Sequence, residues 1–520
     1  MSPRRTRTTL TRRRLLIGGG ILVAGCAAVP IGGAATFFLA NRPDSTVGDI
    51  DFTNPLAIPP LIDPEPDANG RKTFDLTLQT GQSRIIPDGT AETWGVNGPF
   101  LGPTLRARRG DTVAFAIHNE LPADSTLHWH GMHLPADMDG GPHQMVPVGE
   151  TWTPEWTIDQ PASTLWYHPH PHGATAEHVY RGVAGLFLLD DDDSAALDLP
   201  REYGVDDIPL IIQDKRFTGD GDLTMDTGSF FDQLGGSASF GVLGDTMLAN
   251  GTYAPYVDVT RELTRFRILN GSNARFYNLG FADERPFHLI ATDNGLVPGE
   301  PVELTRLQLG PGERAEIVVA CEPAERVILR SFEQDLGGSG RQIGANDTFD
   351  LLQLRAAGTL ESSPALPETL GGSGAPDVPD DATTRSFTLE GHGSINGAKM
   401  DMGRIDEVVP ANALEVWRVE SNGLPHTFHI HGSTFHVLDV DGREPAAVLR
   451  GPKDTVFVGP DQAVTLAVQF AGYTDPETPY MYHCHILRHE DNGMMGQFVV
   501  VDPGTGDTVP RTIESHHAHH

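Results

Sequence analysis

Cysteine, aromatic residues and positive charge are all scarce in this sequence. Only three of the 520 residues are cysteine, namely Cys26, Cys321 and Cys484, which excludes a fold held together by a set of disulfides. Aromatic residues make up 7% of the chain, whereas glycine (58) and proline (40) are frequent, and this balance favours short strands joined by turns over long helices. We therefore predict an all-β protein, and the length predicts about two to four domains.

The shortage of positive charge also limits the partners of the protein. There are 37 Lys and Arg residues against 70 Asp and Glu residues, so the formal net charge is −33. Six of the arginines lie within the first 14 residues, which makes the rest of the chain more acidic still. Such a charge repels nucleic acid and anionic lipid, so we expect no nucleic-acid binding and a soluble, exported protein.

The first 40 residues have the layout of an export signal. Arg12-Arg13-Arg14 precedes apolar and small residues that continue to Ala40, as in a bacterial twin-arginine signal. We predict export by that pathway to the periplasm, the cell envelope or the extracellular space. Two alternatives stay open. Residues 15–40 are long enough for a membrane anchor, and Cys26 lies in a box that resembles a lipidation site, although the apolar run continues beyond it.

Alternating apolar and polar residues, interrupted by glycine and proline, indicate three β modules. The middle module has a single histidine, His288, so no metal site is expected there. Its Cys321 lies in an apolar run and is expected to be an inert buried thiol. We assign 1–40 to the leader, 41–70 to a tether, 71–195, 205–360 and 385–503 to the modules, 361–384 to a linker, and 504–520 to a tail whose four terminal histidines we expect to be disordered.

The stretch 482–495 carries the clearest chemical signal in the chain. It combines Cys484 with three histidines and Met494 within a few residues. Thiolate, imidazole and thioether together are the ligands of a blue-copper electron-transfer site. Copper is therefore the first hypothesis.

Histidines recur elsewhere with a spacing of two residues. The 22 histidines predict about one His-x-His pair by chance, yet four pairs occur outside the tail: His128/His130, His168/His170, His429/His431 and His483/His485. In a strand, residues i and i+2 point to one side, so each pair delivers two imidazoles to one place. Eight imidazoles exceed any ordinary zinc site and are enough for a cluster of three copper ions. His426 and His489, near the third and fourth pairs, could complete a mononuclear site with Cys484 and Met494.

These segments resemble the four copper-binding motifs of three-domain multicopper oxidases, such as bacterial laccases and copper-efflux oxidases. The resemblance covers about residues 70–502 and implies three cupredoxin-like Greek-key β-barrel domains that hold four copper ions. It assigns His426, Cys484, His489 and Met494 to type 1 copper, His128 and His429 to type 2, and His130, His168, His170, His431, His483 and His485 to the type 3 pair. It also matches Asp139 and Glu490 to acidic residues that pass protons to the cluster. For Asp139, the start of a Gly-rich turn is the alternative interpretation.

The resemblance implies a laccase-like enzyme that couples one-electron oxidation of small phenolic or aromatic donors to the reduction of dioxygen to water. Asn422 and Leu424 stand where copper-efflux oxidases have an acidic residue and a methionine, and the linker has no methionine, so oxidation of cuprous or ferrous ions is the second hypothesis. The third is a non-catalytic exported protein of the same fold, like the division-associated relatives that lack copper ligands. A monomer is expected.

The remaining histidines and methionines carry weaker signals. We expect His133, His143, His172, His178 and His436 to be satisfied polar residues rather than ligands, and His118 and His392 to be structural or exposed. The methionines Met132, Met138 and Met145 recur in one segment and are expected to fill irregular packing rather than bind cuprous ion.

Overall fold

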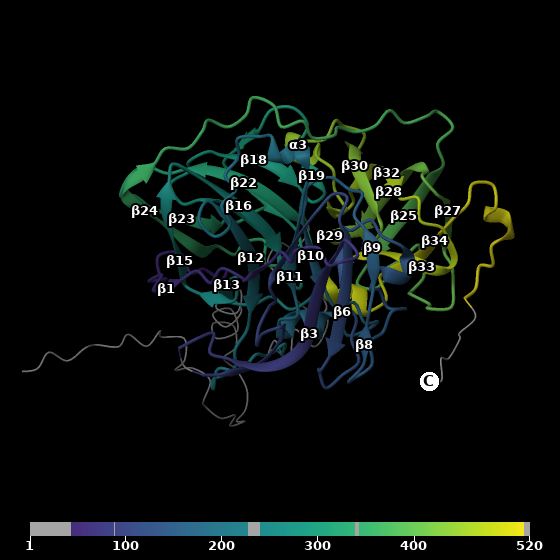
Figure 1. Cartoon of the computed structure of the whole chain (residues 1–520), viewed down its shortest axis with the longest axis horizontal. Helices are drawn as coiled ribbons and strands as arrows, with labels where there is room; N and C mark the ends of the chain where they lie inside the picture. The colour runs from purple at the N-terminus through teal and green to yellow at the C-terminus, as the bar shows by residue number, and fades with distance from the viewer. Residues whose placement is uncertain (1–42, 88, 227–239, 338–342, 514–520) are drawn as a thin grey trace, which may run out of the picture. The chain divides into compact units, whose positions relative to one another are not determined.

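The computed structural model describes residues 43–87, 89–226, 240–337 and 343–513. Over these residues almost all regular structure is β-strand, which confirms the all-β prediction, and the strands form six sheets that pair into three modules (Figure 1). None of the helices described there has the length and apolar character needed to cross a bilayer. The predicted leader and the terminal histidines of the tail lie outside the described residues.

The first module consists of two packed sheets whose inner faces are apolar. Along β3 the side chains of Phe74, Leu76 and Leu78 are buried and their neighbours are more exposed, as the period of two predicted. One sheet has the order β4 (Ala91–Val96), β3 (Arg71–Ser83), β6 (Thr112–Asn119), β8 (Thr151–Trp152), with β9 (Glu155–Thr157) beside β6. The other has the order β2 (Leu61–Ile62), β5 (Thr104–Arg108), β11 (Gly185–Asp190), β10 (Ser163–His168), β7 (His128–His130).

The second module has the same two-layer construction and the largest buried apolar cluster. The runs 210–212, 265–269 and 314–319 lie in the neighbouring strands β12, β16 and β22. One sheet contains β1 (Asn54–Pro55), β15 (Pro255–Arg261), β24 (Phe349–Glu361), β23 (Arg326–Ser331), β17 (Tyr277–Phe281) and β21 (Leu307–Leu309). The other contains β14 (Thr252–Tyr253), β13 (Thr246–Ala249), β12 (Asp207–Lys215), β16 (Leu263–Asn270), β22 (Arg314–Ala320), β18 (Phe287–Thr292), β19 (Gly295–Leu296) and β20 (Val302–Leu304).

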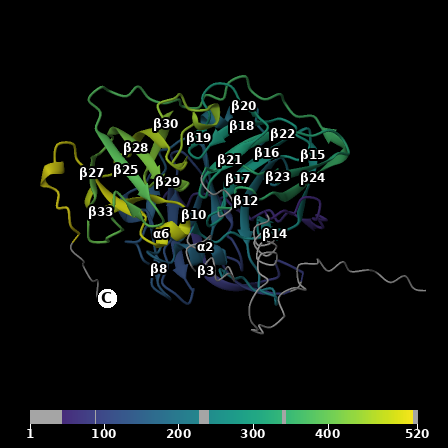
Figure 2. The same cartoon turned by 180° about the vertical axis from the view of Figure 1, so that it is seen from behind.

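The third module encloses Trp417, Phe428, Tyr482 and Cys484 between its two sheets. The first sheet has the order β26 (Ser394–Ile395), β25 (Thr384–Glu390), β28 (Leu414–Asn422), β32 (Ala463–Phe470), β30 (Ser433–Val440). The second has the order β27 (Glu407–Pro410), β34 (Met495–Val501), β33 (Asp475–Cys484), β29 (His426–Ile430), β31 (Thr455–Val458). Strands β10 of the first module and β29 of the third lie side by side in both views (Figures 1 and 2).

Two short helices join the first and third modules. Helices α2 (Thr175–Arg181) and α6 (Leu487–Asp491) are neighbours in Figure 2. Leu487 of α6 packs with Ala176 and Val179 of α2 in one buried apolar cluster. The carboxylate of Asp491 accepts hydrogen bonds from the backbone N–H groups of Thr175 (2.9 Å) and Ala176 (3.1 Å). These contacts attach the helix that follows Cys484 to the helix that follows His170.

The two segments predicted to connect modules run along them. In the described part of the tether, 43–70, β1 pairs with β15 of the second module and β2 pairs with β5 of the first. The linker 361–384 has no strand between β24 and β25, but its Leu370 is buried in the core of the second module. Hydrogen bonds and apolar contacts therefore fix both segments to the modules.

Candidate metal centre

Strand pairing brings the predicted ligands together from the first and third modules. His128 and His130 lie on β7, which pairs with the β10 strand that ends at His168, in the register His168↔His128. In the third module, β29 pairs with β33 in the register His429↔His483. All twelve predicted ligands are buried, and each side chain is at most 1% exposed. They are His128, His130, His168, His170, His426, His429, His431, His483, Cys484, His485, His489 and Met494.

One group of three histidines points its lone pairs at a common position. The Nε2 atom of His483 lies 3.2 Å from Nε2 of both His170 and His431. The opposite Nδ1 atoms face acceptors, since His431 donates to Asp139 Oδ2 at 2.7 Å, and those of His170 and His483 lie 3.5 and 3.3 Å from the Glu490 carboxylate. With the protons on Nδ1, three unprotonated nitrogens face one another, which is unfavourable unless a cation lies between them.

A second group of three contains His130, His168 and His485, and one ring nitrogen of each lies within 4.8 Å of one ring nitrogen of each of the others. His130 Nδ1 is 3.4 Å from His168 Nε2. Their outer nitrogens again donate elsewhere, from His130 Nε2 to Asp454 Oδ1 at 3.0 Å and from His168 Nδ1 to the Pro169 carbonyl at 2.9 Å. Both ring nitrogens of His485 are buried without a hydrogen-bond partner.

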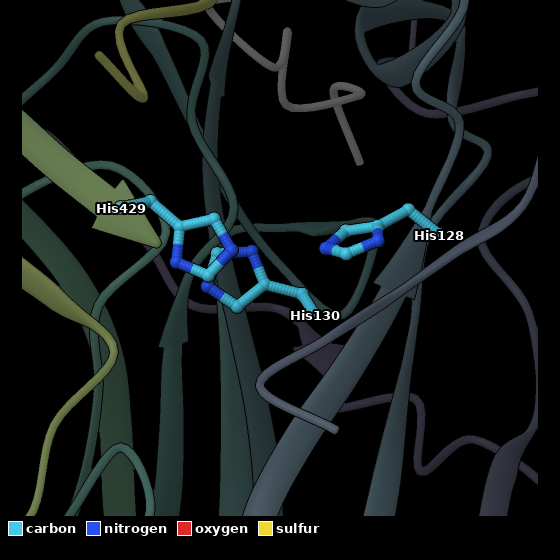
Figure 3. A group of neighbouring side chains, drawn as sticks. All are labelled: His128, His130 and His429. Carbon is cyan, nitrogen blue, oxygen red and sulfur yellow. The ribbon is translucent and has the colours of Figure 1, made fainter. Parts of the chain in front are cut away.

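The rings of His128 and His429 are oriented in the same way, with Nδ1 as the hydrogen-bond donor and Nε2 unprotonated. Each Nδ1 donates to a backbone carbonyl, that of Asp139 at 2.9 Å and that of Asp454 at 2.8 Å, while both Nε2 atoms are buried without a partner. Figure 3 shows the ring of His128 facing the overlapping rings of His130 and His429, whose centroids are 3.7 Å apart. Buried ring nitrogens without a partner on His128, His170, His429 and His485, within a set of eight converging histidines, fit a cluster of metal ions better than an apolar core.

The sulfur site lies beside this cluster in the third module. His426 Nδ1 and His489 Nδ1 lie 3.3 and 3.6 Å from Cys484 Sγ, and 3.2 Å from each other. Met494 is fully buried, and its backbone bonds to both His489 and Cys484. Because His483 and His485 flank Cys484, the sulfur site is joined to both groups of three through the backbone.

Burial sets the protonation of these side chains. Burial, reinforced by neighbouring imidazoles, lowers the pKa of His170, His431 and His483 well below the usual value, and burial lowers that of His426 to about 3. All four are therefore neutral, which is the metal-binding form. Burial raises the pKa of the Cys484 thiol to about 12, so formation of the thiolate depends on a cation at this position.

Asp139 and Glu490, the two predicted relay residues, both contact cluster histidines. Besides accepting from His431, Asp139 lies 3.4 Å from His128 Nδ1 through its Oδ1 atom. Burial, followed by the charge of the neighbouring Asp491, raises the pKa of Glu490 well above its usual range. The two carboxyl groups therefore approach the same group of three histidines from different elements.

Sequence reasoning missed three residues near the centre. His392 was expected to be structural or exposed, but its Nδ1 lies 3.0 Å from His489 Nε2. Asp454 contacts His130 and His429 and is itself held by Arg314 of the second module. His392, Asp454 and Arg314 do not belong to any of the sequence motifs. Each reaches the centre through a tertiary contact, which the spacing of residues in the sequence does not reveal.

The other histidines have hydrogen-bond partners outside the centre or are exposed, as expected. His133 bonds to Thr434, His143 to Gln497, His178 to Ser125, His436 to Ser373 and His118 to Thr151, whereas His172 is exposed. Met132 is buried in the core of the first module, Met138 packs against that core, and Met145 is 42% exposed. Cys321 is buried, and burial raises the pKa of its thiol to about 12.

Comparison with known proteins decides the family. Two family models, both described as multicopper oxidase, match residues 78–194 and 374–504. A multicopper oxidase of Staphylococcus aureus is 34% identical over 86% of this chain and 92% of its own length. This chain belongs to the multicopper oxidase family. Its modules are accordingly cupredoxin-like domains, and family membership supports an oxidoreductase that binds copper and uses oxygen and donor substrates.

Two further relatives bear on what this family member does. The solved structure of a laccase-like multicopper oxidase from the lignin-degrading bacterium Ochrobactrum sp., with oxidase activity towards lignin model compounds, is 36% identical, with a TM-score of 0.78 over 86% of this chain and 100% of that one. The cell division protein FtsP of Xenorhabdus nematophila is 35% identical over 95% of this chain and 100% of its own length. The family thus includes relatives named for oxidation and for cell division.

Proposed function

We propose that this protein is a laccase-like multicopper oxidase that couples four one-electron oxidations of phenolic or aromatic donors to the reduction of dioxygen to two waters. The observation that carries the proposal is that eleven of the twelve predicted ligands gather in groups of three buried side chains, while Met494, the twelfth, is buried and bonded through its backbone to Cys484 and His489. A chain that had lost its copper would have no reason to keep eight histidine nitrogens facing one another in its interior.

The proposal includes four copper ions. Cys484, His426, His489 and Met494 hold the type 1 ion, and His128 and His429 hold the type 2 ion. The six remaining histidines divide into His130, His168 and His485 for one type 3 ion and His170, His431 and His483 for the other. Neutral imidazoles suit this role, and an outer hydrogen bond selects the tautomer and orients the ring in His128, His130, His168, His429 and His431.

Bound copper would supply one-electron storage at the sulfur site and oxygen reduction at the three-ion cluster. The chain separates these tasks. Cys484 sits between two cluster ligands, so an electron that reaches its sulfur has a short covalent path to His483 and His485. Asp139 and Glu490 hold carboxyl oxygens against His431, His483 and His170, where they can pass protons that water formation requires.

Phenolic donors are favoured by the likeness to the Ochrobactrum enzyme, whose activity on lignin model compounds is of that type. Oxidation of cuprous or ferrous ions is the alternative within the same architecture. A non-catalytic role in cell division is a second candidate function, favoured by the match to FtsP over its whole length.

We also propose export by the twin-arginine pathway to the periplasm or cell envelope, with cleavage or anchoring of the leader, and a monomeric state.

The replacement Cys484→Ser tests the proposal, with Cys321→Ser as the matched control because it changes the other buried free cysteine. The copper-loaded wild type and the control should show an intense blue absorption and oxidise a phenol with oxygen uptake, and the Cys484 variant should do neither. A wild type that binds no copper would favour the cell-division role. Faster turnover of cuprous ion than of a phenol, with free copper controlled, would favour the metal-oxidase alternative.

A further inference from the structure

His392 occupies the outer edge of the proposed type 1 site. Because His489 faces Cys484 through Nδ1, its Nε2 carries the proton and donates it to His392 Nδ1 at 3.0 Å. The two ring centroids are 5.0 Å apart. His489 itself is 0% exposed, whereas His392 is partly exposed. His392 thus lies between the predicted ligand His489 and the protein surface.

Among the described residues, neighbouring side chains also cover the rings of His489 and His426. The ring of Phe240 from the second module covers His489 edge to face, with centroids 5.4 Å apart. His426 is also 0% exposed, and its outer nitrogen, Nε2, is buried. In the part of the chain that the structure describes, His392 is the side chain hydrogen-bonded to the outer nitrogen of His489, and it is partly exposed.

The local backbone is built to hold His392 in place. It stands between two glycines in the turn that joins β25 to β26, and Gly391 adopts φ +58°, which other residues rarely tolerate. A Cβ at Gly393 would lie 2.9 Å from the carbonyl oxygen of Asn492, the residue that ends α6. Since α6 carries His489, the close approach that glycine permits fixes the distance between the two imidazoles.

From these contacts we propose that His392 is the residue that small aromatic donors touch, and that it passes their electrons to His489. This inference rests on the proposed type 1 assignment. Each donor would lose one electron, which would travel through His392 and the hydrogen bond to His489, a residue that would hold the copper ion together with Cys484. A phenolic donor also releases its proton to solvent. His392 is in this sense a residue of the donor site and not a metal ligand.

The test is anaerobic bleaching of the blue band by a phenol, measured by stopped flow in wild type, His392→Leu and His392→Gln. Leucine covers His489 but cannot accept its hydrogen bond, so we expect bleaching at least about tenfold slower. Glutamine keeps an acceptor oxygen and should restore most of the rate. His288→Phe, at a half-exposed histidine of the second module, is the control and should bleach like wild type.

A measurement of the reduction potential of the type 1 site distinguishes electron transfer through His392 from two simpler roles, which are adjusting that potential and shielding His489 from solvent. Loss of the acceptor makes His489 a weaker ligand for the oxidised ion, so His392→Leu should raise the potential. If His392 only tuned the potential or shielded the site, the blue band of His392→Leu would bleach faster than that of the wild type. Faster bleaching would overturn the proposal, and so would an unchanged rate. If His392→Leu carries no blue band, His392→Phe takes its place. A wild type without a blue band would instead refute the proposed function.

Discussion

Arg314 and Asp454 form a buried, two-pronged ion pair that joins the second domain to the copper centre. Their Nη1–Oδ1 and Nη2–Oδ2 distances are 2.7 and 2.6 Å, and both side chains are 0% exposed. Asp454 in turn accepts from His130 of the first domain through its carboxylate, and from His429 of the third through its carbonyl. The second domain, which has no predicted ligands, therefore orients one predicted ligand histidine of the first domain and one of the third.

Replacing Arg314 with methionine should weaken both the fold and the cluster. Asp454 would be left as an unpaired buried charge, which costs about 3–5 kcal/mol of unfolding free energy. Loss of this outer contact should lower copper affinity at the cluster by about 10- to 100-fold. Chemical unfolding and the type 2 resonance signal during chelator titration measure the two effects. Arg418→Met removes an exposed pair with Glu420 and should cost less than ~1 kcal/mol; equal costs for the two variants would contradict the prediction.

Asp139→Asn and Glu490→Gln should slow turnover without loss of copper. Each amide keeps the shape of the carboxyl group but cannot take up and release a proton, so oxygen consumption should fall by about 10²-fold or more. The blue band and its anaerobic reduction by a phenol should stay at wild-type values, because the sulfur site is untouched. Asp137→Asn changes an exposed carboxylate two residues from Asp139 and is the control. Unchanged oxygen consumption in both variants would rule out the relay.

Glu316 should make stability depend on pH in the acid range. Burial alone would raise its pKa, but the charges of Arg265 and Arg267 outweigh burial and lower the pKa to about 2 from an ordinary 4.5. The folded state thus binds fewer protons than the unfolded state, so this contribution is complete above about pH 4.5 and is lost as pH falls towards 2. The unfolding free energies of wild type and Glu316→Gln should differ most near neutral pH and converge in acid. A gap that stays constant between about pH 6 and pH 3 would contradict this.

Much of the candidate site could be read from the spacing of its residues. A His-x-His pair on a strand puts two imidazoles on one face, so four pairs and one cysteine were enough to predict which side chains gather and that copper is the ion. The all-β fold followed from alternation along runs such as 74–78, which β3 confirms. Export and the leader remain predictions, since residues 1–42 lie outside the described part of the chain.

The sequence by itself determined the ligand types and their approximate grouping, because strand geometry is local and repeats every two residues. Only the tertiary structure decided how the ligands divide. His168 and His170 fall into different groups of three, as do His483 and His485, since each pair is separated across the cluster by partners from the other domain. It also decided that Arg314 orients the cluster and that His392 covers His489. Those contacts join residues 140 and 97 positions apart, so only the packing of whole domains and loops brings them together.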